Sequence, residues 1–458
     1  MGLTMTTELL SPAGSLKNMR YAFAYGADAV YAGQPRYSLR VRNNEFTLEN
    51  LALGILEAHQ LGKKFYVVSN IAPHNAKLKT FIRDLTPVVA LQPDALIMSD
   101  PGLIMLVREH FPTVPLHLSV QANAVNWATV KFWQTQGISR VILSRELSLE
   151  EITEIRQQVP EMELEVFVHG ALCMAYSGRC LLSGYLNKRD PNQGTCTNAC
   201  RWDYKISPAQ EDDVGNMVES YTPAPTLGLG PTTPQALLLT DKMRPDEPMS
   251  ATEDEHGTYI MNSKDLRAVE HVPRLVELGI HSLKIEGRTK SFYYCARTAQ
   301  VYRKAIDDAL AGKPFDPSLL TTLEGLAHRG YTEGFLRRHT HDSYQNTQQG
   351  YSVSDRQQFV GEFSQAEEQG FAEVIVKNKF QCGDHLEVMT PSGNFSFILD
   401  TLRDKRHQPL TVAPGDGYRV WIPMPPNTEL RYALLIRHLE NGQTTQAPHR
   451  TNPRQGMV

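Results

Sequence analysis

Short apolar runs alternate with amphipathic segments through about the first 330 residues of the chain. Eight of these runs have the length and the flanking turn residues of buried strands: 8–14, 29–33, 64–71, 95–100, 116–122, 140–146, 164–170 and 282–288. The segments between most of them read as helices, notably 15–26, 76–89, 127–136, 148–158 and, after the last run, 291–312. This alternation predicts a (β/α)8 TIM-like barrel rather than an open doubly wound sheet, and no GxGxxG follows the first strand.

The periodicity changes in two other regions. From Val360 onward, six short alternating runs separated by Gly, Pro, Asp and Asn predict a small antiparallel β-barrel domain. Residues 205–257 are rich in Pro, Asp, Glu and Thr and show little periodicity, which indicates a mobile insert. The predicted organisation is a barrel over 1–335 containing a cysteine-rich insert at 165–204 and the acidic insert at 205–257, a linker at 336–355, a β-domain at 356–445 and a disordered tail at 446–458.

Composition narrows the class of protein. The chain has 458 residues, 41% hydrophobic and 21% charged, as in ordinary soluble proteins, and its net charge of −4 argues against non-specific coating of nucleic acid. Neither a membrane-spanning apolar stretch nor a secretory leader is recognisable, so no membrane partner and a cytoplasmic location are expected. In that compartment the six cysteines indicate metal binding or catalysis rather than disulfides.

Four cysteines lie together after the strand at 164–170, with the spacing C-x6-C-x15-C-x3-C: Cys173, Cys180, Cys196 and Cys200. Structural zinc sites usually combine two closely spaced pairs, and only the second pair here fits. A 4Fe–4S cluster also takes four thiolates, with less uniform spacing. The position at the end of a barrel strand favours the cluster, zinc remains the alternative, and a redox disulfide would leave two cysteines unexplained.

The carboxyl ends of the predicted strands carry many polar residues, and these ends form the catalytic face of a (β/α)8 barrel. They include Asn70, Gln121, Arg145, His169, Glu286 and Arg288. Val166 and Val168 alternate with Phe167 and His169 along the strand at 164–170, which places His169 on the side of Phe167. His169 and Glu165 are candidate proton-transfer groups. Basic side chains in the loop after the second strand, in the cysteine region and after the last helix suggest an RNA-docking surface, with Tyr37 available for stacking: Arg36, Arg40, Arg42, Lys188, Arg189, Arg337 and Arg338.

The stretch EVFVHGALCMAYSGRCLLS resembles the signature of the collagenase-like peptidase family, number thirty-two among the U types. The resemblance rests on Glu165, Phe167, Gly170, Ala171, Cys173, Gly178, Cys180 and Ser183, and extends from ELLSPAG to the C-terminal domain. PRYSLRVRNNEF, NIAPHNAKLK, HLSVQANAVNW and GTCTNACRW are similar to a branch of that family that hydroxylates tRNA.

The resemblance implies oxygen-independent 5-hydroxylation of the wobble uridine in the tRNA anticodon loop. The product, 5-hydroxyuridine, is the precursor of 5-methoxy- and 5-carboxymethoxyuridine. It also implies a 4Fe–4S cluster on the four cysteines, prephenate as co-substrate and, as a further partner, the machinery that assembles iron–sulfur clusters. The two carboxylates of prephenate should be bound by Arg or Lys side chains. The candidates are Arg145, Lys264, Lys284 and Arg288, and Asn70 and Gln121 are further candidates for binding prephenate. Glu286 joins His169 and Glu165 as a candidate catalytic group.

Two other functions remain open. The family name suggests a peptidase, but the chain contains no HExxH or GxSxG, and a His169–Cys173 pair would leave three cysteines without a role. A non-catalytic RNA-binding protein with a structural metal site is the second alternative; it would bind RNA without changing its nucleosides.

Overall fold

The computed structural model describes in full residues 6–34, 36–38, 45–71, 73–172, 264–328, 330–337 and 356–439. Between Tyr204 and Ser263, and in three short strands near the C-terminal domain, it describes the backbone of strands only. The chain divides into two compact units, one over 1–23, 27–316 and 329–351 and the other over 24–26, 317–328 and 352–458.

Eight parallel strands close the barrel of the first unit, in the order β15-β1-β2-β3-β4-β5-β6-β7, with β7 paired back to β15. Their bounds are β1 Glu8–Pro12, β2 Ala29–Gly33, β3 Lys64–Ser69, β4 Ala95–Met98, β5 Leu116–Leu118, β6 Arg140–Ile142, β7 Glu163–Ala171 and β15 Ser282–Ile285. Each of the eight predicted strands is present, which confirms the (β/α)8 barrel.

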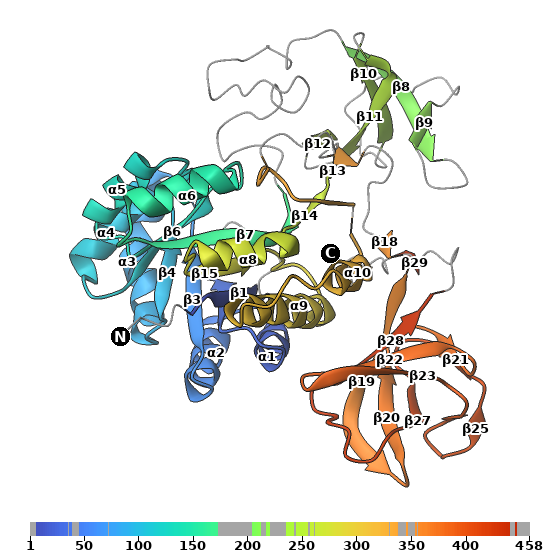
Figure 1. The fold of residues 1–458 in the computed structure, drawn as a ribbon. Coiled ribbons are helices and arrows are strands. Elements are labelled where there is room, and N and C mark those ends of the chain that lie inside the picture. Colours follow the sequence, from blue (N-terminus) through green and yellow to red (C-terminus); the bar gives the residue numbers. More distant parts are fainter. Residues whose placement is uncertain are drawn as a thin grey trace, which may run out of the picture. The chain divides into compact units, whose positions relative to one another are not determined.

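Helices follow most of these strands and lie outside them (Figure 1). They are α1 Leu16–Ala24, α2 Leu48–Gln60, α3 Asn75–Ala90, α4 Pro101–His110, α5 Trp127–Thr135, α6 Leu149–Gln158, α8 Val272–Glu277 and α9 Phe292–Leu310. Polar side chains cap several of them; for example, the Ser148 hydroxyl and the Glu151 carboxylate form a reciprocal capping box on α6. Among the described helices, none is long and apolar enough to cross a membrane.

Two further strands extend the end of β7. Strand β14, Asp265–Arg267, runs antiparallel to residues 169–171, and β16, Tyr331–Thr332, pairs with β14 in parallel. These strands bring the segment 330–337 beside the carboxyl end of β7, next to the point where the cysteine-rich region begins.

The insert predicted to be mobile contains regular structure. Its strands β12, β11, β10, β8 and β9 form a five-stranded sheet in that order, with the bounds Gly257–Ile260, Arg244–Asp254, Gln235–Asp241, Tyr204–Glu211 and Met217–Glu219. The sequence prediction missed these strands because proline and acidic residues, both rare in strands, interrupt the alternation. The strands are thus an addition to the sequence prediction, and the mobility of the insert stays a prediction.

The second unit contains α10, Ser318–Glu324, and the predicted antiparallel β-domain, which is confirmed. Eight strands form its main sheet in the order β23-β22-β28-β19-β20-β27-β24-β25. Their bounds are Gly393–Ile398, His385–Thr390, Leu434–His438, Gln357–Glu368, Phe371–Val376, Arg419–Pro423, Leu402–Arg403 and Pro409–Leu410. Two short pairs accompany this sheet, β21 Phe380–Gln381 with β26 Val412–Ala413 and β18 Val353–Ser354 with β29 Thr445–Gln446. Buried Val374, Leu386, Ile422 and Leu435 lie in the apolar core.

Candidate active site

A chain of buried charges crosses the interior of the barrel. The Arg140 guanidinium on β6 lies 2.6 Å from a Glu8 carboxylate oxygen on β1 and 3.3 Å from Glu165 on β7. Strands β1 and β6 are not neighbours, so the Arg140–Glu8 contact spans the lumen. Lys284 Nζ on β15 lies 2.8 Å from the other oxygen of Glu165. Branched apolar residues usually fill such lumens, so a charged interior is unusual and must be internally compensated.

Burial and pairing act in opposite directions on the ionisation of these groups. Burial alone would raise the pKa of Glu8, but the adjacent Arg140 guanidinium outweighs it and the pKa is lowered. Burial lowers the pKa of Lys284, and the neighbouring Glu165 carboxylate opposes this shift. Burial, followed by the nearby Arg140 charge, holds the pKa of His117 well below its usual value. His117 is therefore a neutral imidazole, packed edge-on against Tyr66.

The lowered pKa of Glu8 predicts a specific acid sensitivity. Because its folded-state pKa lies below the usual 4.5, the pair with Arg140 stabilises the fold fully above that pH, and this contribution is lost as the pH falls through the folded-state pKa. We expect the stability gap between the wild type and Glu8→Gln to shrink from pH 6 to about pH 3, as measured by urea unfolding. A gap that stays constant across this range would contradict the assignment.

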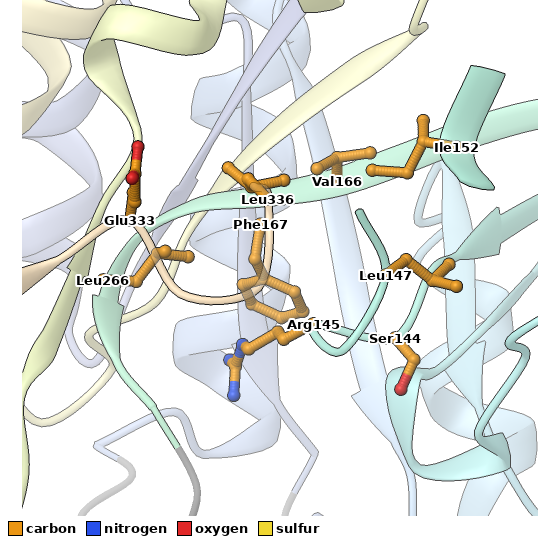
Figure 2. A pocket seen from close by; sticks show the side chains of 9 residues that line it. All are labelled: Ser144, Arg145, Leu147, Ile152, Val166, Phe167, Leu266, Glu333 and Leu336. Carbon is orange, nitrogen blue, oxygen red and sulfur yellow. The ribbon is translucent and has the colours of Figure 1, made fainter. Parts of the chain in front are cut away.

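Above this network, at the carboxyl ends of the strands, lies a second polar group of residues. The Tyr31 hydroxyl donates to a Glu286 carboxylate oxygen at 3.1 Å, and the Arg145 guanidinium lies 3.8 Å from the same oxygen. Arg145 also lies over the Phe167 ring, 3.8 Å from its centroid, as Figure 2 shows. Arg288 lies 5.7 Å from the centroid of the Tyr31 ring. The structure thus gathers Arg145, Glu286 and Arg288 around Tyr31.

Arg288 has spare donor capacity at this face. Its Nη1 donates to the Ser38 hydroxyl at 2.8 Å, whereas its buried Nε has no hydrogen-bond partner among the described residues. A buried guanidinium N–H without an acceptor is costly, so this position suits an anionic ligand that supplies one. The side chain of Lys264, between β13 (Asn262–Ser263) and β14, packs near Gly330 instead.

The predicted pair Asn70 and Gln121 also comes together, at the ends of β3 and β5. The Asn70 amide donates to the Gln121 side-chain oxygen at 2.9 Å, and the Ser119 hydroxyl donates to that oxygen as well. Ser119 is a member of this face that was not among the predicted residues, although it lies in the run LHLSVQA, two residues before the predicted Gln121.

His169 does not lie on the side of Phe167, so the simple alternation expected for β7 is wrong at this residue. Phe167 pairs with Lys284, but His169, two residues on, pairs with the next residue, Ile285. This β-bulge turns His169 away from the side of Phe167. Its ring is buried beside the rings of Tyr294, Tyr302 and Tyr331, and its Nδ1 lies 3.3 Å from the Tyr302 hydroxyl. Glu165, fully buried with Lys284 and Arg140, faces the lumen.

Three predicted RNA-binding residues fall within the described residues. Tyr37 is buried, its hydroxyl donates to Asp84 at 2.9 Å, and its ring meets Phe81 edge-on, so it has no face for a base. Arg36 is 60% exposed but paired with Asp84 at 2.7 Å. Arg337 is 59% exposed and lies 3.2 Å from both Glu270 and Glu333.

Arg337 also contacts a cluster of three ionisable side chains. Glu270, His271 and Glu333 are close enough together to share a metal ion. The Arg337 guanidinium already contacts both carboxylates, and His271 Nε2 lies 2.8 Å from Glu333, so we interpret the group as an ion-pair cluster. Outside the described residues lie Cys173, Cys180, Cys196 and Cys200, and the predicted RNA-binding residues Arg40, Arg42, Lys188, Arg189 and Arg338.

A small cavity adjoins Arg145 and Phe167 between β6, β7, β14 and the segment 333–336 (Figure 2). Apolar side chains, among them Leu147, Leu266 and Leu336, form most of its wall. Its volume is about 10 Å³, which is barely the space of one water molecule, so it is not a substrate pocket.

A parallel (β/α)8 barrel with charged and amide side chains at its carboxyl-terminal face is the architecture of an enzyme of the TIM-barrel class. The chain belongs to peptidase family U32: the family model matches residues 14–346, and the model of the family's C-terminal domain matches residues 355–437.

Comparison with known proteins narrows the relationship within the family. The chain is 73% identical to tRNA hydroxylation protein P of Escherichia coli (strain K12), over 96% of this chain and 99% of that protein. It is 70% identical to tRNA hydroxylation protein P of Haemophilus influenzae, over 96% and 98% of the two chains. It is also 30% identical to the 23S rRNA 5-hydroxycytidine C2501 synthase of Escherichia coli, over 83% of this chain and 50% of that protein.

Proposed function

We propose that this protein is a tRNA hydroxylase that converts the wobble uridine of its substrates to 5-hydroxyuridine in the cytoplasm. The observation that carries the proposal is the 73% identity, over nearly the whole of both chains, to a protein named for tRNA hydroxylation. The more distant relative is named for 5-hydroxycytidine synthesis, so hydroxylation at C5 of a pyrimidine is a chemistry that both RNA substrates could share.

The reaction sets the chemical requirements of the site. Replacing the uridine C5–H bond by C5–OH forms one carbon–oxygen bond and removes two electrons and a proton from the base. The enzyme therefore needs an oxygen donor, an electron acceptor and groups that move a proton. Peptide hydrolysis needs none of the redox components, and we find no residue arrangement among the described residues that favours it over hydroxylation.

Four thiolates within 28 residues of sequence, Cys173 to Cys200, form a donor set that suits a 4Fe–4S cluster. We propose that Cys173, Cys180, Cys196 and Cys200, which follow β7 in the sequence, hold this cluster. When bound, such a cluster supplies one-electron redox chemistry. The protein's own residues bind and orient the substrates and handle the proton.

The polar group around Tyr31 is our candidate site for prephenate, the proposed co-substrate. Arg288 offers the buried Nε, which has no acceptor among the described residues, and Arg145 adds a second guanidinium 3.8 Å from a Glu286 carboxylate oxygen. Two guanidinium forks at one site match a ligand with two carboxylates. Glu286, bonded to the Tyr31 hydroxyl, is then placed to accept a proton from the base or its intermediate.

We expect Arg288→Lys to raise the KM for prephenate by about 10- to 100-fold while leaving the KM for tRNA unchanged. The change keeps the charge but removes the planar fork, and a charge-assisted hydrogen bond contributes about 1.5–3 kcal/mol. Steady-state kinetics of hydroxylation measure both constants. Arg83→Lys, on the exposed side of α3, is the matched control. A KM for prephenate equal to that of the control would exclude Arg288 from this site.

The proposed function is tested by anaerobic incubation of the purified protein with unmodified tRNA, prephenate and an electron acceptor, followed by nucleoside mass spectrometry. We expect a uridine product that is heavier by one oxygen atom and maps to the wobble position. Binding of tRNA with no new nucleoside under these conditions would favour the non-catalytic alternative. Cleavage of a peptide by metal-free protein would favour the peptidase.

A further inference from the structure

The C-terminal β-domain carries a compact basic turn that the proposed function does not use. It joins β24 to β25 and contains Arg403, Lys405, Arg406 and His407, which we call the basic turn. The turn is rigid for its length. The Asp404 carboxylate accepts from the backbone N–H groups of Arg406 and Gln408, at 2.8 and 2.9 Å, and its backbone pairs again with 407 and 408.

Aromatic side chains of the neighbouring strands hold two of the turn's cationic or ionisable groups in place. The Arg403 guanidinium lies over the ring of Phe371 on β20, 3.9 Å from its centroid. The His407 ring lies against Trp421 on β27 at a centroid distance of 4.7 Å. Contact with a ring face occupies none of the five N–H donors of an arginine, so Arg403 is positioned yet keeps its hydrogen-bonding capacity.

Three cations of this turn lack anionic partners, whereas several other cations of the domain are paired. Lys377, Arg419 and Arg437 each form an ion pair, with Asp416, Glu373 and Asp384. Arg403, Lys405 and Arg406 form none within the part of the chain that the structure describes, and the last two are exposed. The acidic groups close by are Asp404, whose carboxylate caps the turn, and Glu368, 3.5 Å from His407.

We infer that the basic turn binds the sugar–phosphate backbone of the tRNA substrate. Three cations without carboxylate partners, on a preformed turn, match a row of phosphates, which RNA-binding proteins contact with Arg and Lys. Arg403 contacts the Phe371 ring and His407 contacts the Trp421 ring, so the cations and not the rings are the groups that the turn offers to RNA. The inference rests on the proposed function for the identity of the RNA, and it assigns substrate binding to the second unit.

The experiment compares Lys405→Glu/Arg406→Glu with Arg406→Glu and with Lys379→Glu, all in the full-length protein. Lys379 is an exposed cation without a described ion pair in the same domain, beyond the opposite end of β20 from Phe371. It therefore matches the charge change of Arg406→Glu at a site away from the turn. Circular dichroism and thermal unfolding establish that each variant is folded.

We expect the dissociation constant for tRNA at moderate salt to rise roughly 10-fold or more in the double variant and less in Arg406→Glu. The slope of log affinity against log salt concentration is expected to decrease by about one for each phosphate that the turn no longer neutralises. Lys379→Glu is expected to match the wild type in both measurements.

Variants of the turn whose affinity and salt slope equal those of Lys379→Glu would overturn the inference. Nucleoside analysis of the same samples separates this from the proposed function. Hydroxylation by the wild type together with unaltered binding by the turn variants would refute only the docking surface. Wild-type protein that binds tRNA through the turn but never hydroxylates it would refute only the proposed activity.

Discussion

Replacing any one of Cys173, Cys180, Cys196 and Cys200 with alanine is expected to remove iron and acid-labile sulfide from the protein and to abolish tRNA hydroxylation. Loss of a single ligand thiolate opens a four-thiolate cluster to solvent and degradation. Activity should fall by well over 100-fold, since even the outer partners of metal ligands contribute about 10- to 100-fold. Iron and sulfide per chain after anaerobic purification, and hydroxylated nucleoside per turnover, measure the two effects.

Cys382→Ala is the control for these variants. This cysteine lies in the C-terminal domain, where its thiol contacts the Leu410 carbonyl oxygen, and it should be dispensable for both iron and activity. Cys200→Ala protein with full iron content and activity would exclude the four-cysteine assignment. Stoichiometric zinc without iron in the wild type would turn the cysteine site into a structural one.

Glu165→Gln is expected to destabilise the barrel by about 3–5 kcal/mol, the range measured when one partner of a buried ion pair is removed. The substitution preserves shape but leaves the Lys284 ammonium, 4% exposed, without its 2.8 Å carboxylate partner. Urea unfolding at neutral pH measures the loss. We also expect hydroxylation to fall. Lys284 pairs with Phe167 between β15 and β7, and Arg145 of the proposed prephenate site lies over the Phe167 ring, so a disturbance at Lys284 reaches that site.

The double variant Glu165→Gln/Lys284→Met distinguishes the loss of the Glu165–Lys284 ion pair from a general disturbance of core packing. The double variant removes both charges, while Arg140 keeps its contacts with Glu8 and Glu163. The double variant should therefore lose less stability than the sum of the losses in Glu165→Gln and Lys284→Met. Glu277→Gln breaks the exposed Arg274–Glu277 pair and should change stability by no more than about 0.5 kcal/mol. Strictly additive losses at Glu165 and Lys284 would show that the two charges do not interact.

The sequence was sufficient to predict the barrel because its strands are short apolar runs bounded by turns. Each run can be recognised from its local sequence, without knowledge of the strands with which it pairs. The runs 64–71 and 282–288, for example, match β3 and β15 closely. The C-terminal domain was predictable for the same reason. The strands of the insert were not, since β11 contains Pro, Asp and Glu in the sequence RPDEPMSATED.

The candidate site was predictable only in part, because side-chain direction depends on register. Asn70 and Gln121 were correctly expected at one face, since Asn70 follows β3 directly and Gln121 lies three residues after the end of β5. His169 was expected on the side of Phe167, but a single bulged residue reverses its direction, and no local pattern marks that bulge. The Arg140–Glu8 pair joins residues 132 positions apart, so the charged interior could not be read from spacing.

Burial of Tyr37 shows a similar limit. Its flanking arginines suggested an exposed RNA-binding loop, whereas the contacts with Asp84 and Phe81 that bury it come from a helix almost fifty residues away. A single sequence does not reveal such pairings. The composition of this loop correctly indicated a charged segment, but it did not indicate that Arg36 is exposed and Tyr37 is buried.

The most direct test of tRNA hydroxylation as the function is the nucleoside content of tRNA from cells that lack this protein. We predict that 5-hydroxyuridine and its methoxy and carboxymethoxy derivatives are absent from the wobble position, and that the wild-type chain restores them whereas Cys200→Ala does not. Wobble uridines with the same modification in the presence and absence of the protein, under anaerobic growth that excludes oxygen-dependent routes, would contradict the proposed function.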